Sequence, residues 1–328
     1  MTKNWLRKNW TTSQLLTTAL TAATLALPAP HASAAELIPL KVSILPIFDV
    51  APLMTAIDRG FFAEEGLKVT TAPATSGTTA TGGLVAGTFD IAYSNAISVV
   101  MANQQGLHLV MVAPGTKLPA TPPDSTGLTA LSDSRLRTGR DFEGHSIGVN
   151  VLKSVWGLYA RTWVKKTGGD PDKVKFKEIP FPQMVDAITT HQVDSAYLVD
   201  PFLTAAESNP KLKIVAHPFV ESQPNVEIGQ YVVTADFLRK HPQVVAKFVV
   251  GLRKGVAWYN VHLGSPELAK IISGYTHLSP AIIAKVKLLH APAKIDPKQV
   301  QMEADLAFDN GLLKAKTNVS DVISPGAQ

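Results

Sequence analysis

Cysteine is absent from the 328-residue sequence. The chain therefore forms no disulfide, no thiolate metal site and no lipid-modified Cys anchor, and it has no Cys nucleophile. The nine histidines form no H-x-x-x-H or H-E-x-x-H pair, and no G-x-S-x-G, Walker or G-x-G-x-x-G motif occurs. We therefore expect no catalytic residues, no metal and no cofactor, and the sequence favours a binding protein over an enzyme.

Charge of either sign is sparse, since only 17% of the residues are charged. The formal net charge is +5, but Lys3, Arg7 and Lys8 lie in the first 34 residues, which contain no acid. No basic run or Lys/Arg cluster with interleaved aromatics follows, so we expect no nucleic-acid partner. A chain of this length with 45% hydrophobic residues can form a sizeable core, most simply as two domains.

A long apolar run is also missing. The N-terminal stretch "LLTTALTAATLAL" is too short and too rich in Thr to span a bilayer. It follows the basic "MTKNWLRKNW" and precedes Ala32-Ser33-Ala34, an A-x-A cleavage signal. We expect residues 1–34 to be a cleaved signal peptide, the alternative being an amphipathic surface helix. With no twin Arg, no Cys anchor and no membrane span, the predicted location is the periplasm of a Gram-negative cell.

Short apolar strands alternate with helical segments along the rest of the chain, which indicates βαβ units and mainly parallel sheets. Two connections interrupt the alternation, at 114–127 and 218–229. The chain after residue 240 is predicted to be nearly all helical. The expected strands are at 40–45, 67–74, 88–95, 107–115, 146–150, 174–179, 193–200, 212–217 and 230–238, and the expected helices between them include 53–66, 76–87, 96–106, 154–169 and 183–192.

One strand motif occurs twice, in "GTFDIAYSN" (87–95) and "HQVDSAYLVD" (191–200). The two copies share Asp-x-Ala-Tyr and the same order of helices and strands around it, although so short a pattern also recurs by chance. We predict two similar α/β lobes. Their expected boundaries are 35–127 plus 230–328 for lobe 1 and 128–229 for lobe 2, with the helical C-terminus completing lobe 1.

Ligands of open α/β sheets bind beyond the carboxyl ends of the strands, next to helix N-termini. Hydroxylic, aromatic and charged residues gather at these points of the sequence, and two facing lobes would bring them to one cleft. Each has an ordinary alternative: helix capping for the Ser, Thr and Asp residues, core packing for the aromatics, and a solvated cation for the Lys. The candidate ligand-binding residues are Phe48, Asp49, Ser76, Gly77, Thr78, Thr79, Ser94, Asn95, Lys153, Ser154, Trp156, Asp200, Phe202 and Tyr231.

Several stretches carry a family resemblance. The most specific is "AIDRGFFAEEGLKV" (56–69), and "RDFEGHSIGVN" (140–150) resembles the family's D-L-x-G-K-x-I-x-V, with Phe142 and His145 replacing its Leu and Lys. With these and "VDSAYLVDPF" (193–202), the mature chain resembles the nitrate/sulfonate/taurine type of ABC-transporter solute-binding proteins. That superfamily also includes binders of thiamine pyrimidine precursors.

The resemblance implies a type II periplasmic binding protein, with two α/β lobes joined by two hinge segments around a central ligand cleft. It implies ligand contacts at Phe48 and Asp49, Gly77 to Thr79, Ser94 and Asn95, near Ser154 and around Asp200. The implied partners are a small-molecule ligand and an ABC permease and ATPase in the inner membrane, with the binding protein itself a monomer.

Two other functions stay open at this point. One is an enzyme of the pyrimidine-precursor-synthesis branch, whose Cys-rich motif this sequence lacks. The other is a ligand sensor for a membrane receptor. The aromatic candidates favour a flat aromatic or heterocyclic ligand, or an organic acid or sulfonate, but they do not identify it.

Overall fold

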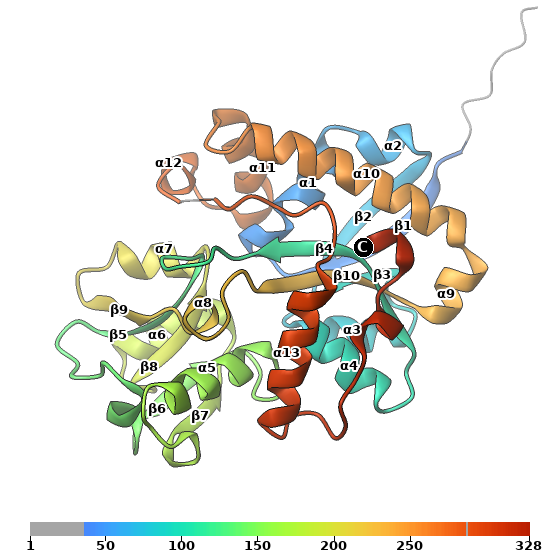
Figure 1. Cartoon of the computed structure of the whole chain (residues 1–328). Coiled ribbons are helices and arrows are strands. Elements are labelled where there is room, and N and C mark those ends of the chain that lie inside the picture. Colours follow the sequence, from blue (N-terminus) through green and yellow to red (C-terminus); the bar gives the residue numbers. More distant parts are fainter. Residues whose placement is uncertain (1–35, 287) are drawn as a thin grey trace, which may run out of the picture. The chain divides into compact units, whose positions relative to one another are not determined.

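Two five-stranded sheets form the framework of the computed structural model, which describes residues 36–286 and 288–328 (Figure 1). The predicted signal peptide lies outside the described residues. Among the described helices, none is both long and apolar enough to cross a membrane.

The first sheet has the strand order β2-β1-β3-β10-β4. β1 pairs in parallel with β2 and β3, whereas β10 is antiparallel to β3 and β4. The predicted mainly parallel sheet is confirmed, with one antiparallel strand that returns from the far end of the chain. The strands are β1 (Ile38–Ile44), β2 (Leu67–Pro73), β3 (Ile91–Ser94), β4 (Leu109–Lys117) and β10 (Glu227–Thr234).

The second sheet repeats this plan in the order β7-β6-β8-β5-β9. β6 is parallel to β7 and β8, and β5, which enters after the first connection, is antiparallel to β8 and β9. Position by position, β5 therefore corresponds to β10, and the predicted two-lobe α/β architecture is confirmed. The strands are β5 (Thr126–Leu131), β6 (Ser146–Val149), β7 (Lys175–Glu178), β8 (Ser195–Val199) and β9 (Leu212–Ala216).

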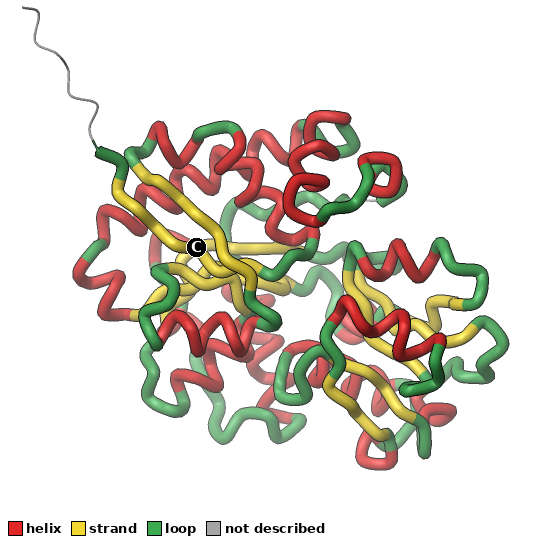
Figure 2. Tube along the Cα trace, turned by 180° about the vertical axis from the view of Figure 1, so that it is seen from behind, coloured by secondary structure: helices red, strands yellow, loops and turns green. Residues whose placement is uncertain are grey.

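Helices flank both sheets, as the view from behind shows (Figure 2). In the first half they are α1 (Ala51–Asp58), α2 (Phe61–Glu64), α3 (Gly77–Val85) and α4 (Ala96–Asn103). In the second they are α5 (Val155–Lys166), α6 (Phe181–Thr189), α7 (Phe202–Glu207) and α8 (Pro218–Ser222). The chain ends with α9 (Ala235–Lys240), α10 (Pro242–Val261), α11 (Pro266–Thr276), α12 (Pro280–Ile283) and α13 (Pro297–Asp309), with 3₁₀ turns at Phe48–Val50, Gly139–Phe142, Pro171–Lys173, Val319–Val322 and Pro325–Ala327.

The repeated Asp-x-Ala-Tyr motif has the same structural role in both sheets. Asp90 accepts a 2.7 Å hydrogen bond from the backbone N–H of Lys41 in β1. Asp194 accepts one of 2.7 Å from the backbone N–H of Ser146 in β6, the corresponding strand. Each carboxylate thus ties the start of its own strand to a neighbour, so the repeated Asp belongs to the fold and not to a ligand site.

Four predictions about the elements were wrong. The helix expected over 53–66 is two helices, because Gly60 adopts a left-handed conformation with φ of +73° between them. The first connection is shorter than expected, because β4 continues to Lys117, paired with Glu227 of β10. The second connection contains α8, and residues 284–286 and 288–296, between α12 and α13, are not helical.

Glycines let α10 pack closely on the first lobe. A Cβ at Gly255 would lie 2.5 Å from the carbonyl oxygen of Pro52 and 2.6 Å from the Cβ of Ala56, both in α1. One turn earlier, a Cβ at Gly251 would lie 2.6 Å from the ring of Phe62. Residues four apart share one helix face, so the face of α10 that packs against α1 and α2 has no side chains at these two positions. The 3₁₀ turn that contains Phe48 and Asp49 directly precedes α1.

Candidate functional site

A cleft lies where strands of both sheets end, and it consists of two adjoining chambers that share Asp49. We name them the Asp200 chamber and the Trp156 chamber, and their cavity volumes are about 20 Å³ and 30 Å³. The Asp200 chamber is lined by Phe48, Asp49, Pro52, Thr116, Ser125, Asp200, Tyr259, Val286, Leu288, Leu289, His290 and Ala291. The Trp156 chamber is lined by Leu45, Ile47, Asp49, Ser76, Gly77, Tyr93, Ser94, Asn95, Asn150, Ser154, Val155, Trp156, Ile228 and Gly229.

Asp49 follows β1 in a 3₁₀ turn and is only 9% exposed. Burial, together with the nearby negative charge of Asp200, raises the pKa of its carboxyl group to about 7. Hydrogen bonds from Thr116 and from Tyr93, whose hydroxyl lies 3.4 Å from Oδ2, partly offset this rise in pKa. Asp49 therefore titrates near neutral pH.

Asp200 follows β8 of the second sheet and is 5% exposed. Burial raises its pKa to about 6, although hydrogen bonds from Thr204 stabilise the ionised form. The backbone N–H and the hydroxyl of Thr204 both donate to Oδ1, at 3.0 and 2.7 Å. Since both bonds use one oxygen, the other remains for a ligand.

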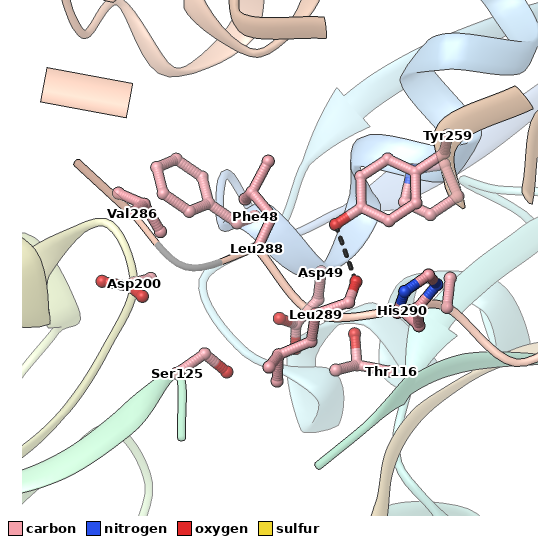
Figure 3. A pocket seen from close by; sticks show the side chains of 12 residues that line it. Phe48, Asp49, Thr116, Ser125, Asp200, Tyr259, Val286, Leu288, Leu289 and His290 are labelled. Atoms are coloured by element: carbon pink, nitrogen blue, oxygen red, sulfur yellow. Dashed lines mark hydrogen bonds between the residues drawn. The ribbon is translucent and has the colours of Figure 1, made fainter. Parts of the chain in front are cut away.

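The Asp200 chamber has an acidic side and an apolar cover (Figure 3). Asp200 directly follows β8 and Ser125 directly precedes β5 of the second sheet, and Phe48, Val286 and Leu288 line the same chamber. The Ser125 hydroxyl is buried and has no hydrogen-bond partner among the described residues. It is thus a donor available within the chamber.

Residues 288–291, between α12 and α13, cover this chamber. The hydroxyl of Tyr259 in α10 donates to the carbonyl of Leu289 at 3.0 Å (Figure 3). The amide of Asn260 makes two hydrogen bonds with the backbone of Ala291, of 2.9 and 2.8 Å. Two consecutive residues of α10 therefore hold this segment at the cleft.

Three helix N-termini surround the Trp156 chamber. Ser76 caps α3 by accepting from the Thr79 N–H at 3.1 Å, and Thr79 Oγ1 accepts from the Ser76 N–H at 3.0 Å. Asn95 caps α4 by accepting from the Ser98 N–H at 2.9 Å. At the third, α5, the Ser154 hydroxyl donates to Val151. These positive helix ends favour ligand oxygen atoms at this side of the cleft.

Gly77 is required by the close approach of α3 to β3. A Cβ there would lie 2.7 Å from the Asn95 amide nitrogen, and the Gly77 carbonyl accepts a 3.0 Å hydrogen bond from Ser94. Any side chain at this position would push α3 away from Ser94 and Asn95 or displace the Asn95 amide.

Trp156 closes the chamber from the second lobe. Its ring makes edge contacts with Phe181, Tyr197 and Phe219, at centroid distances of 5.0 to 5.1 Å. These neighbours fix the indole in one orientation, so it forms a rigid aromatic wall. The amide oxygen of Asn150 beside it is buried without a hydrogen-bond partner among the described residues.

Nine of the fourteen sequence candidates line one or both chambers: Phe48, Asp49, Ser76, Gly77, Ser94, Asn95, Ser154, Trp156 and Asp200. The other five lie elsewhere. Thr79 completes the cap of α3, and Thr78 lies 3.3 Å from the Ser98 hydroxyl. Lys153 is exposed beside Arg161, and Phe202 lines an apolar surface groove with Phe181. Tyr231 is buried between Tyr93 and Phe248.

Several lining residues were not predicted from the sequence: Thr116, Ser125, Asn150, Tyr259, Val286 and residues 288–291. One signal was present for the segment. The run "VKLLHAPAKIDP" (286–297) has two prolines after an apolar stretch and therefore breaks the helical pattern there.

Within residues 36–286 and 288–328, no group of three or more His, Asp and Glu side chains is arranged to hold a metal ion. The buried carboxylate of Asp124 is bound by protein groups: its Oδ1 accepts a 2.6 Å hydrogen bond from the backbone N–H of Thr126 and lies 3.7 Å from Nδ1 of His217.

A comparison with family models matches residues 47–262 to the NMT1/THI5-like family, which is two thirds of the chain and includes most of the cleft. The chain belongs to this family. The resemblance predicted from the sequence is confirmed.

Curated relatives of this NMT1/THI5-like protein include the bicarbonate-binding protein CmpA of Synechococcus elongatus. It is 23% identical, over 81% of this chain and 64% of the relative. The bicarbonate transport ATP-binding protein CmpC of the same organism is 25% identical, over 74% of this chain and 39% of the relative. The chain thus spans less than two thirds of the length of these relatives.

Solved structures show the same fold at low identity. The alkanesulfonate-binding protein SsuA of Xanthomonas axonopodis, bound to MOPS, has a TM-score of 0.74 and 20% identity, covering 88% of this chain and 99% of its own. The nitrate-binding protein NrtA of Synechocystis has a TM-score of 0.73 and 14% identity, covering 88% of this chain and 86% of its own. The predicted periplasmic-binding-protein fold is confirmed.

Proposed function

We propose that this protein is the substrate-binding component of an ABC importer. The observation that carries the proposal is that Asp49, from the first sheet, and Asp200, from the second, line one chamber. A solute bound there touches both lobes, so it stabilises the closed state over the open one. Relatives named as bicarbonate-, sulfonate- and nitrate-binding proteins support an import role over catalysis or sensing.

The solute is a small organic molecule with a flat aromatic or heterocyclic body, or an organic acid or sulfonate. Rings of Phe48, Tyr93, Trp156 and Tyr259 line the two chambers and offer apolar walls. The helix ends at the Trp156 chamber suit oxygen atoms of the solute. Trp156 and Asp200 therefore contact different parts of one bound molecule.

Export belongs to the proposal. Residues 1–34 are cleaved as a signal peptide, and the mature chain acts as a periplasmic monomer without a lipid anchor. Its lobes are residues 35–127 plus 230–328 and residues 128–229. The sheets support this division to within a few residues. The chain passes to the second sheet between the end of β4 at Lys117 and the start of β5 at Thr126, and it returns between the end of β9 at Ala216 and the start of β10 at Glu227.

The experiment is uptake in a strain that lacks the gene. Native mass spectrometry of the mature protein identifies the bound solute, and labelled solute is then supplied to mutant and complemented cells. We expect uptake only in complemented cells that also contain the permease and ATPase. Conversion of the solute by the purified protein, or uptake independent of the gene, would overturn the proposed function.

A further inference from the structure

We infer that the solute presents a cationic or donor-rich nitrogen group, such as an amidinium or a protonated amine, to Asp49 and Asp200. This inference rests on the proposed function, because it specifies the solute that the cleft binds. It does not follow from the relatives, which are named as binding bicarbonate, nitrate and an alkanesulfonate.

Both carboxyl groups are buried in the Asp200 chamber, and each has capacity for a further donor. Asp200 uses Oδ1 for both bonds from Thr204. Asp49 accepts only a long 3.4 Å bond from Tyr93 and a bond from Thr116. An N–H group between the two aspartates would therefore find acceptors from both lobes.

Ser125 is an independent sign of a polar occupant. Its side chain is nine-tenths buried, it lines the chamber, and its hydroxyl has no partner among the described residues. A buried hydroxyl without a partner is uncommon in folded proteins. Figure 3 shows it on the same side of the chamber as Asp200. A polar group at Asp200 would satisfy it as well.

Asp124 adds a third negative charge close by. It is 9% exposed, and its Oδ2 is buried with no hydrogen-bond partner among the described residues. Its charge acts on both Asp49 and Asp200, and it is only partly balanced by His217. A cationic group reduces the repulsion among these carboxylates, whereas an anion at the same place increases it.

The chamber walls suit a planar cation. Phe48 and Tyr259 line the chamber together with the apolar segment at Leu288. Aromatic faces attract cations from which water has been removed.

The probes are benzamidinium and benzoate, which share a flat ring and carry opposite charges. Calorimetry with the full mature protein compares wild type with Asp49→Asn and Asp200→Asn. Asp133→Asn is the matched control, since Asp133 is exposed and lines neither chamber. We expect wild type to bind benzamidinium, and each cleft substitution to weaken that binding about 30-fold while the control leaves it unchanged.

Benzoate gives the opposite expectation: the cleft substitutions leave its binding unchanged or strengthen it. The inference is overturned if wild type does not bind benzamidinium. It is also overturned if the Asn variants bind it normally, or if they weaken benzoate equally. Uptake that depends on the gene but carries a purely anionic solute would overturn this inference and leave the proposed function intact.

Discussion

The backbone N–H of Phe48 donates a 3.4 Å hydrogen bond to the backbone carbonyl of Asp200. Phe48 follows β1 of the first sheet, Asp200 follows β8 of the second, and both line the Asp200 chamber. At this length the bond is weak. A solute that contacts Asp49 and Asp200 together adds stronger links across the same gap, which is the physical basis of the proposed closure.

Replacing Trp156 separates binding from folding. Because its ring packs edge-on against Phe181, Tyr197 and Phe219, Trp156→Ala leaves a cavity and costs about 3–5 kcal/mol of stability. Trp156→Phe keeps most of the packing and reduces the aromatic wall of the chamber. We expect it to weaken solute binding by roughly threefold to tenfold, measured by calorimetry. Unchanged affinity would place the solute outside the Trp156 chamber.

The α10 contact with α1 requires glycine. Gly255→Ala places a methyl group 2.5 Å from the Pro52 carbonyl, and we expect it to destabilise the protein by about 1–3 kcal/mol in urea unfolding. Gly274→Ala in α11 is the control. A Cβ there meets nothing within 4 Å, so this change should stabilise the helix by about 0.5–1 kcal/mol. Equal effects of both changes would contradict the packing argument.

The repeated aspartates predict a symmetric loss of stability. Asp90→Ala and Asp194→Ala each leave a backbone N–H of the neighbouring strand without its acceptor. We expect a cost of about 1–2 kcal/mol for each, with nearly additive effects in the double variant because they lie in different sheets. Solute affinity should not change. A large loss of affinity would show that the motif has a role in binding.

Glu303 makes stability depend on pH. It is fully buried, both of its carboxyl oxygens lack a partner among the described residues, and burial raises its pKa from 4.5 to about 8. The folded state keeps the proton that the unfolded chain loses, so this contribution destabilises the fold as pH rises from 4.5 to about 8.

Glu303→Gln removes that cost. We expect it to raise the free energy of unfolding at pH 8 by on the order of 1–3 kcal/mol, and to have little effect at pH 4.5. Glu36→Gln, at an exposed position, is the control. Denaturant unfolding at the two pH values tests this. A variant that is less stable than wild type at pH 8 would mean that Glu303 is ionised and stabilising.

The sequence predicted the parts of the site that depend on local order. Phe48 and Asp49 follow β1, Ser94 ends β3 and Asp200 follows β8, and strand ends are visible in the hydrophobic pattern. Tyr231 occupies a similar place in the pattern, but in the structure it packs on Tyr93 and Phe248. The side chain's environment depends on the register of β10 against strands more than a hundred residues earlier, which local periodicity does not contain.

The cover of the Asp200 chamber could not be predicted for the same reason. Its position depends on the contacts of Leu289 and Ala291 with Tyr259 and Asn260, thirty residues away in α10. Lys153 shows that a residue next to a cleft residue in sequence need not lie in the cleft. It immediately precedes Ser154 in sequence, yet it lies on the exposed side of the start of α5.

The most direct test of the account is native mass spectrometry of the mature protein, purified without denaturation from its own cells. We predict a single small molecule bound without a covalent bond to the wild type and absent from Asp49→Asn/Asp200→Asn. Wild type with no bound molecule after purification from cells supplied with nutrients, or a double variant that retains the same molecule, would contradict binding between the two aspartates.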